Sequence, residues 1–478
     1  MEDQDTMERF KLLSDADLLR IDQASRALLW EVGSFVGDPL AMDYFEKAGA
    51  KVDRENNRVY IPDYLITKTL NMCASSVRLY NRRNDKPMIV GGDDVYFGTV
   101  GIATNVLDFE TNEYRSVLTQ DLIDIIELSD AQDCPDYILV PATPTDVPPA
   151  TVDLWETKQL LLHTSKHFIA EAQNAVNCRK TIEMCAEVVG GMDKLKEKPI
   201  MTMLVTLTSP LHFRQDVSDL IIETAKAGLP LFIESGPMSG GTGPATLAGN
   251  LVQANAEVLF AFVLAKAVNP EVPLIYAMWA RLLDMLRATC SHGGPEFPMQ
   301  RVCTAQLAKY YGLPCGGGAV LGDTKSIDVQ LGMEKMGTGL LPALAGLNMC
   351  TGMGLFADEN AISLETLVID QEVTGWIRRV LRGIEVTEET VDLDVIKEVG
   401  PGGDFVRTKH TLENYQKEQF IPQIMDRGYL ALDKDPLAKT MRKRARKLYP
   451  KIMKKYKAPE IPEEIVAKLD EIIAREEA

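Results

Sequence analysis

Short apolar segments recur along this chain from about residue 135, and helical stretches separate them. Continuous apolar strands that alternate with helices are typical of parallel strands buried on both faces. Seven or so such units favour an α/β fold with a TIM (β/α)8 barrel; an open doubly wound sheet is the alternative. The expected strands are DYILVPAT (136–143), HFIAEAQ (167–173), IMTMLVTL (200–207), LPLFIES (229–235), PLIYAMW (273–279), PCGGGAVLG (314–322) and ALAGLNMCTG (343–352).

Three regions are predicted along the chain. Residues 1–120 form an N-terminal α+β region, whose first part has helical periodicity with Ser14 as a candidate N-cap. Residues 121–385 hold the barrel core, and residues 386–478 form a polar C-terminal helical extension. The eighth strand is not fixed by the sequence, because LETLVID (364–370) is either a strand or the beginning of a helix.

Charge and composition exclude several classes of protein. The formal net charge is −18, so nucleic acid is not an expected partner. No run of 18 apolar residues predicts a membrane span, and the polar, acidic start MEDQDTMERF is unlike a signal peptide. The eight cysteines are scattered without a C-x-x-C pair, as in reduced cytoplasmic proteins. We therefore expect a cytoplasmic enzyme or binding protein, with a homo-oligomer as one of its expected states.

A glycine-rich loop, SGPMSGGTGPATLA (235–248), follows one of the expected strands and precedes a long helix. The loop lacks the Lys and Ser/Thr of a P-loop and the glycine spacing of a dinucleotide fingerprint. Pro244 is suited to open the helix, which would leave N–H groups at its start. The interpretations are a tight turn or a barrel-top loop whose Gly240, Gly241 and Gly243 amides face a pocket.

Polar residues follow the expected strands at the end where TIM barrels build their sites. Trp279 and Arg281 lie close together just past one strand, and Glu234 ends another. Tryptophan offers the best aromatic face for a cation, and arginine is the best partner for a carboxylate. The alternative is a core tryptophan beside a surface arginine. The five histidines form no metal-binding signature, so we expect no metal site.

Several long stretches resemble one known family. They include PMSGGTGPATLAGNLVQANAEVLFAFVLAKAVNPEVPLIY, QLAKYYGLPCGGG, DVQLGMEK and EVGPGGDFVRTKHTLENY. Over almost its whole length the chain resembles the trimethylamine methyltransferase family, in particular its members without pyrrolysine. The resemblance implies a TIM barrel that moves a methyl group from an amine to Co(I) of a separate corrinoid protein. The chain itself is then expected to bind no cofactor directly.

One departure from the founding family member concerns the substrate. Where that member has pyrrolysine, the matching region GLNMCTGMGLF (346–356) contains only standard residues. Relatives without pyrrolysine demethylate quaternary amines, so the resemblance implies glycine betaine, proline betaine, carnitine or butyrobetaine as the substrate. A quaternary ammonium leaves as a neutral amine, so no proton has to be delivered. The alternatives are a cytoplasmic betaine-binding protein without catalysis and a barrel enzyme that binds cobalamin itself.

The pocket that the resemblance implies is assigned as follows. We expect the trimethylammonium group to contact Trp279, with Tyr96, Phe97 or Phe356 completing the wall. Glu234 would supply a counter-charge. The betaine carboxylate would bind Arg281. Asn348 and the amides of Gly240, Gly241 and Gly243 are its expected helpers.

The segment 434–457 is a basic island in an acidic chain. It carries eleven Lys and Arg against one acid, Asp435. The segment is either a solvated helix face or a docking surface for the corrinoid protein. In the docking interpretation its contacts are Arg442, Lys443, Arg444 and Arg446.

Overall fold

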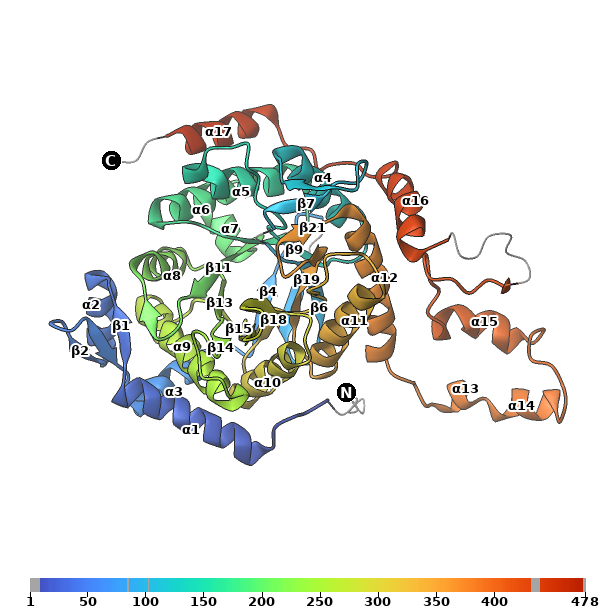
Figure 1. The fold of residues 1–478 in the computed structure, drawn as a ribbon, viewed down its shortest axis with the longest axis horizontal. Helices are drawn as coiled ribbons and strands as arrows, with labels where there is room; N and C mark the ends of the chain where they lie inside the picture. Colours follow the sequence, from blue (N-terminus) through green and yellow to red (C-terminus); the bar gives the residue numbers. More distant parts are fainter. Residues whose placement is uncertain (1–8, 84–85, 102, 431–438, 476–478) are drawn as a thin grey trace.

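The barrel is closed. A computed structural model describes residues 9–83, 86–101, 103–430 and 439–475. Eight parallel strands form the barrel in the order β10-β11-β13-β15-β18-β19-β6-β9 (Figure 1). The expected TIM barrel is therefore confirmed. The strands are β6 (Tyr96–Thr99), β9 (Tyr137–Leu139), β10 (His167–Ala170), β11 (Met201–Leu207), β13 (Leu231–Ser235), β15 (Leu274–Met278), β18 (Cys315–Gly318) and β19 (Met349–Met353).

The eighth strand comes from the N-terminal side of the chain. Seven barrel strands overlap the segments that the apolar pattern predicted, and the remaining one is β6, which pairs with β19 and β9. The prediction that the barrel core begins at residue 121 was therefore wrong, because the barrel closes with a strand that comes before that residue. The segment 364–370 is helical: the Ser363 hydroxyl accepts a hydrogen bond from the backbone N–H of Thr366 and caps a helix there.

Helices cover the outside of the barrel (Figure 1). Among them α9 is long and apolar enough to cross a membrane by length and composition alone, but 83% of its most apolar window is buried inside the protein. The helices α1, α2 and α3 cover its outer side, which explains why it is apolar all round. The covering helices are α4 (Thr119–Ala131), α5 (Val152–His163), α6 (Ala175–Val189), α7 (Met192–Glu197), α8 (Gln215–Ala227), α9 (Leu247–Val268), α10 (Glu296–Tyr311), α11 (Val329–Leu344) and α12 (Leu364–Leu381), with a 3-10 turn at Pro149–Thr151.

The N-terminal region packs on this wall. Its first helix begins where the sequence predicted: the Ser14 hydroxyl accepts from the Asp17 N–H, and the Asp17 carboxylate accepts from the Ser14 N–H. The elements are α1 (Asp15–Glu31), α2 (Pro39–Ala48), α3 (Asp63–Asn71), β1 (Ser34–Val36), β2 (Lys51–Asp53), β3 (Arg58–Tyr60), β4 (Ser76–Leu79) and β5 (Met88–Gly91). The strand β12 (His212–Phe213) joins β1, β2 and β3 in one sheet.

Two small sheets lie in the connections that leave the C-terminal ends of the barrel strands. One consists of β14, β16 and β17, and the other of β20, β21, β7 and β8. Both sheets therefore belong to the side of the barrel where these strands end, and their ladders fix the backbone there. The strands are β7 (Asn105–Leu107), β8 (Tyr114–Ser116), β14 (Met238–Ser239), β16 (Arg281–Asp284), β17 (Thr289–Ser291), β20 (Leu355–Phe356) and β21 (Ala361–Ile362).

The C-terminal extension first leaves the barrel and then returns to it. Helices α13, α14 and α15 project from the body, whereas α16 and α17 lie against it (Figure 1). The bounds are α13 (Glu388–Val391), α14 (Leu393–Val399), α15 (Lys409–Glu418), α16 (Met441–Met453) and α17 (Glu463–Ala474). Helix α16 carries most of the basic segment 434–457, of which residues 434–438 lie outside the described part of the chain.

Part of that basic charge is used inside the molecule. The guanidinium groups of Arg442 and Arg446 lie 3.1 Å and 2.9 Å from one oxygen of the buried Glu365, at the start of α12. Arg444 donates from Nε to the carbonyl of Ile424 at 2.5 Å. These three arginines attach α16 to the body of the protein. Docking of a partner by this segment stays a prediction, and reversing these charges would disturb the fold as well.

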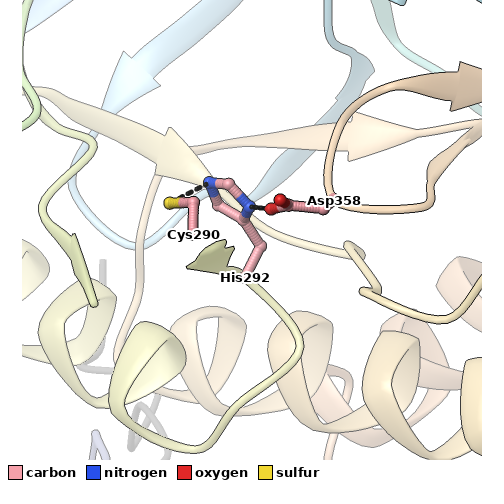
Figure 2. Close-up of side chains that lie close together, drawn as sticks. All are labelled: Cys290, His292 and Asp358. Atoms are coloured by element: carbon pink, nitrogen blue, oxygen red, sulfur yellow. Dashed lines mark hydrogen bonds and ion pairs between the residues drawn. The ribbon is translucent and has the colours of Figure 1, made fainter. Parts of the chain in front are cut away.

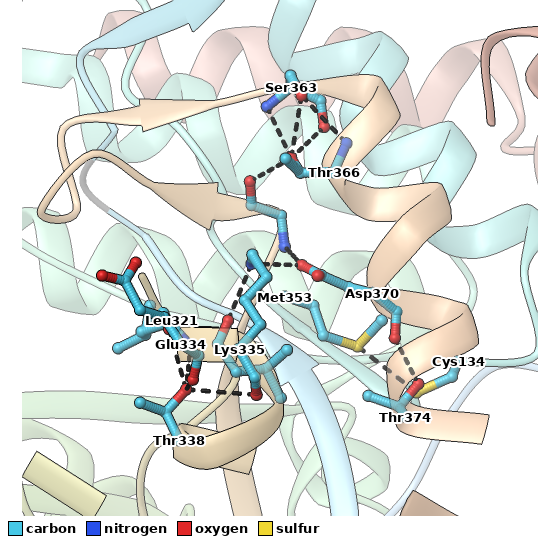
Figure 3. A network of polar contacts seen from close by, with 12 residues as sticks. Cys134, Leu321, Glu334, Lys335, Thr338, Met353, Ser363, Thr366, Asp370 and Thr374 are labelled. Atoms are coloured by element: carbon cyan, nitrogen blue, oxygen red, sulfur yellow. Dashed lines mark hydrogen bonds and ion pairs between the residues drawn. The ribbon is translucent and has the colours of Figure 1, made fainter. Parts of the chain in front are cut away.

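A buried ion pair ties two strand-end loops to the outer helices. Lys335 of α11 and Asp370 of α12 are both fully buried, with Nζ and Oδ2 2.7 Å apart (Figure 3). Lys335 also donates to the carbonyl of Val320, and the same Asp370 oxygen accepts from the N–H of Gly354 at 2.6 Å. The pair therefore fixes the backbone just past β18 and just past β19.

Removing one partner of this pair should destabilise the folded protein. We expect Lys335→Met to lower the free energy of unfolding by about 3–5 kcal/mol, because Asp370 is left buried without its counter-charge. Urea unfolding followed by circular dichroism measures the loss. In the control Lys335→Met/Asp370→Asn, the amide oxygen still accepts from Gly354, so much of the stability should return. A double variant as unstable as the single one would contradict this assignment.

Candidate functional site

Polar side chains meet at the C-terminal ends of neighbouring barrel strands. Glu171 directly follows β10, Thr206 lies near the end of β11, Glu234 lies in β13 and Trp279 directly follows β15. Because parallel strands end at the same edge, these side chains share the mouth of the barrel, where TIM-barrel enzymes build their sites. Thr206 is exposed, so the mouth is open to solvent at this point.

Glu234 is a buried carboxyl group that ionises near neutrality. Its Oε1 accepts a hydrogen bond from the Thr206 hydroxyl at 3.0 Å. Burial raises the pKa of Glu234 to about 7, with Glu171 and Glu359 adding to the rise, while the Thr206 bond and Arg301 oppose it. The group is thus poised to become an anion when a cation arrives beside it.

Glu171 is a second acid with the same tendency. Burial and the nearby Asp153 raise the pKa of Glu171 to about 7. Behind it, burial and Glu171 itself raise the pKa of Glu156 well above its usual range. A cavity of about 170 Å³ opens beside Glu171 and Thr206. Of the acids named here only Glu171 lines this cavity, whose other walls come from β11 and α8. A cation beside Glu171 would relieve both its repulsion by the neighbouring acids and its loss of solvation.

Trp279 is held in one orientation by its neighbours. It is 6% exposed, and its Nε1 donates to Oε1 of Glu359 at 2.8 Å. The guanidinium of Arg301 lies 5.9 Å from the centre of the indole, and Phe297 contacts it edge to face. Gly318 makes room for the ring, since a Cβ there would lie 2.9 Å from it. Arg301 is therefore already a cationic neighbour of the indole.

Two arginines beside Trp279 keep unused donors. Arg301 is fully buried and donates from Nη2 to the Ala280 carbonyl, but within the described chain its Nε and Nη1 have no hydrogen-bond partner. Burial, reinforced by Arg281, lowers the pKa of Arg301 to about 9, although Glu234 and Glu359 oppose the shift. The Nε of Arg281 likewise has no partner among the described residues. Such donors suit a carboxylate.

A histidine between two carboxylates completes the site. Nδ1 of His292 lies 2.8 Å from Asp358, and Nε2 lies 3.3 Å from Glu359. Burial lowers the pKa of His292, but Glu359, Asp358 and the contact with Cys290 outweigh it and raise the pKa to about 10. Glu359 is therefore shared between Trp279 and His292.

Three of the residues expected in the pocket lie at the opposite end of the barrel. Tyr96 and Phe97 begin β6, and Phe97 contacts Arg378 through its ring, beside Asp136 at the start of β9. Asn348 precedes β19, where its amide donates to the carbonyls of Gly92 and Asp94. These placements were wrong because the start of a parallel strand faces away from the mouth.

Two further expectations also differ from the structure. Phe356 lies on the mouth side, but it is fully buried in a separate apolar cluster with Leu107 and Leu331. The amides of Gly240, Gly241 and Gly243 donate to carbonyls of their own turn, at 2.8–3.0 Å, and are not available to a ligand. The helix after the turn begins at Leu247 and not at Pro244.

Glu234, Trp279 and Arg281 are the expected residues that the mouth brings together. A Cβ at Gly236 would lie 3.4 Å from Trp279 and 3.6 Å from Arg281, so these two side chains flank the same glycine. Glu171 could have been chosen from the sequence, because it directly follows an apolar strand. Arg301 and Glu359 gave no such signal, since one lies within a helix and the other in a loop between short strands.

Known proteins match this chain over nearly its full length. Residues 3–478 match the family model described as trimethylamine methyltransferase (MTTB). Trimethylamine methyltransferase MttB of Desulfitobacterium hafniense (strain DSM 10664 / DCB-2) is 33% identical, over 97% of this chain and 93% of the relative. Glycine betaine methyltransferase of D. hafniense (strain Y51) is 31% identical, over 98% and 97%.

Among solved structures, the monomethylamine methyltransferase of Methanosarcina barkeri is similar with a TM-score of 0.49 and 14% identity. That similarity covers 94% of this chain and 96% of the other. The family match and the relatives above decide the assignment: the chain belongs to the trimethylamine methyltransferase (MTTB) family and is a methyltransferase.

Proposed function

We propose that this methyltransferase takes a methyl group from a quaternary amine that also carries a carboxylate, such as glycine betaine. The acceptor is Co(I) of a separate corrinoid protein, and no pyrrolysine takes part. The observation that carries the proposal is the set of charges that share the mouth with Trp279: the buried acids Glu171 and Glu234, and guanidinium donors that have no partner among the described residues. A zwitterion matches both. A relative named glycine betaine methyltransferase supports this choice.

The acids act by balancing a fixed positive charge. A quaternary ammonium has no N–H to donate, so it is held by electrostatic attraction and by contact with aromatic surface. Glu171 and Glu234 would ionise as the cation enters and would replace part of its lost hydration. Because the nitrogen becomes neutral when the methyl group leaves, very strong binding of the ammonium would hold back the reaction. Acids that ionise only near neutrality suit this requirement.

The arginines orient the other end of the substrate. Arg281 and Arg301 would bind the carboxylate through the Nε and Nη1 donors that have no partner within the described residues. A carboxylate fixed in this way turns the trimethylammonium group toward the acids and leaves one methyl group facing the open mouth. Orientation of this kind is worth up to about 7–11 kcal/mol of a reaction barrier in favourable cases.

The methyl group must then meet its acceptor at the mouth. Co(I) in a corrinoid supplies the electron pair that attacks the methyl carbon. Large exposed apolar side chains lie on connections at this end: Met285 and Leu286 at the tip between β16 and β17, and Val329 and Met333 on the first turns of α11. Leu286 is 92% exposed. Exposed apolar groups of this kind fit a protein partner that covers the mouth and excludes water.

Pyrrolysine independence rests on the late strand. Residues 346–356 span β19 and β20 and consist of standard amino acids. The backbone N–H of Gly354 in this stretch donates a hydrogen bond to the carboxylate of Asp370. Nothing in the proposed chemistry needs an electrophilic side chain here, since the quaternary nitrogen is already activated by its charge.

The direct test is methyl transfer itself. Protein from a host without the pyrrolysine system should methylate a reduced corrinoid protein when supplied with glycine betaine, proline betaine, carnitine or butyrobetaine. The visible spectrum follows the reaction, and the purified chain alone should carry no corrinoid colour. Activity confined to trimethylamine would contradict the quaternary-amine proposal, and bound corrinoid would contradict the separate carrier.

Arginine substitutions should separate recognition of the carboxylate from recognition of the ammonium. We expect Arg281→Met and Arg301→Met each to weaken binding of the best betaine by about 1.5–3 kcal/mol, the usual loss of a charge-assisted hydrogen bond. Tetramethylammonium has no carboxylate, so its binding should be unchanged or tighter after a nearby positive charge is removed. Titration calorimetry with both compounds measures the two affinities. An equal loss for both would mean that the arginines are structural.

Binding of the cation should strengthen as pH rises through about 7, the pKa of both Glu171 and Glu234. Below that pH the carboxyl groups are neutral, and above it they are anions. We expect about a tenfold gain in tetramethylammonium affinity from about pH 6 to about pH 8. The other charged groups near these two acids are Asp153, Glu156, Arg301 and Glu359.

Glu234→Gln is the matched control for this pH dependence. It keeps an acceptor for Thr206 but cannot ionise, so the dependence on pH should become shallower and the affinity at high pH should fall. A wild-type affinity that does not change over this range would exclude the two acids as the partners of the ammonium.

A further inference from the structure

A thiol, an imidazole and a carboxylate converge beside the mouth of the barrel. Cys290 of β17, His292 just after it and Asp358 each offer a possible ligand atom, and these atoms lie within 4.8 Å of one another. Figure 2 shows the imidazole between the other two groups, with the thiol at one ring nitrogen and the carboxylate at the other. The proposed methyl transfer uses none of these three side chains.

A fourth group joins the cluster at the nitrogen that faces the thiol. His292 Nε2 lies 3.7 Å from Cys290 Sγ and 3.3 Å from Glu359 Oε1. In a tetrahedral zinc site, the usual metal–ligand lengths place a thiolate sulfur about 3.6 Å and a carboxylate oxygen about 3.3 Å from the imidazole nitrogen. Both observed separations therefore match the two edges that meet at the imidazole nitrogen in such a site.

The other ring nitrogen has the partner that a metal-binding histidine requires. His292 Nδ1 lies 2.8 Å from Asp358 Oδ1. A histidine that binds a metal through one nitrogen almost always donates its other N–H to a carboxylate or carbonyl, which fixes the tautomer and the ring plane. Asp358 would therefore orient the imidazole, and Glu359, the next residue in the chain, would reach the metal.

The backbone that carries the ligands is held in place. The N–H of His292 donates to one oxygen of Asp323 at 2.8 Å, and the hydroxyl of Ser291 donates to the other at 2.8 Å. Cys290 pairs with Leu283 in the ladder between β17 and β16. A site on a fixed hairpin keeps its ligands in position without a bound ion, as a preorganised metal site requires.

We propose that Cys290, His292 and Glu359 bind a divalent cation of the zinc class, with Asp358 as the outer carboxylate. A thiolate with an imidazole favours Zn²⁺ or Co²⁺ over Mg²⁺ or Ca²⁺, which prefer oxygen ligands alone. Three protein ligands leave a fourth position for water or for an oxygen of the substrate. Because Trp279 also donates to Glu359, the metal would fix the indole that lines the substrate site.

Co²⁺ is the probe for this site. The full-length protein is treated with a chelator, dialysed and titrated with Co²⁺ under anaerobic, reducing conditions. We expect one equivalent to bind with a near-ultraviolet thiolate-to-cobalt band and the intense visible bands of tetrahedral Co²⁺, and Zn²⁺ should abolish both. Absence of the thiolate band from the wild-type protein would overturn the proposal.

Variants identify the ligands. Cys290→Ser should lose the thiolate band, whereas Cys73→Ser, which changes another half-buried cysteine, should keep it. Asp358→Asn should keep the band and weaken Co²⁺ binding by about 10–100-fold, as for other outer partners of a metal-binding histidine. Thermal melting without metal checks that each variant is folded. A folded Cys290→Ser protein that retains the band would also overturn the proposal. None of these readouts depends on methyl transfer.

Discussion

Closure of the barrel by β6 is the constraint on which the site depends. This strand has only four residues, yet it bridges β19 and β9 and completes the cylinder. In a closed parallel barrel every strand ends at the same rim, so side chains that are far apart in the chain become neighbours. Glu171, Glu234 and Trp279 meet for this reason. The buried pair of Lys335 and Asp370 then fixes the backbone past β18 and β19, where the rim would otherwise be held by loops alone.

Glu359 links the parts of the site that have different tasks. Its carboxylate accepts from the Trp279 indole, lies beside His292 and affects the pKa of Arg301. A change of charge near this one residue would therefore be felt both at the substrate pocket and at the cluster around Cys290. The acids and bases of the mouth are best understood as one network, in which the betaine would add a cation near the glutamates and an anion near the arginines. A metal ion would add positive charge at the cluster around Cys290.

The position of charge on the surface bears on how a partner protein could approach. Arg442 and Arg446 look from the sequence like exposed cations, but both contact the buried Glu365 and attach α16 to α12. The exposed apolar residues Leu286 and Val329, by contrast, lie on connections at the end of the barrel that carries the site. A partner that must reach a methyl group inside the mouth has to cover this end. For the proposed partner, the rim would offer a more direct docking surface than the basic helix.

The sequence by itself determined the local part of the answer. Apolar runs and helical periodicity are properties of neighbouring residues, so seven of the eight strands, the cap at Ser14 and the barrel were predictable, and so were Glu234, Trp279 and Arg281 as strand-end residues. Which of these strand-end residues become neighbours is decided by the closure of the barrel and the register of its strands. That is why Tyr96, Phe97 and Asn348 were assigned to the wrong end, and why Arg301 was missed. Cys290 and Asp358 are 68 residues apart, and only the fold brings their side chains to one imidazole.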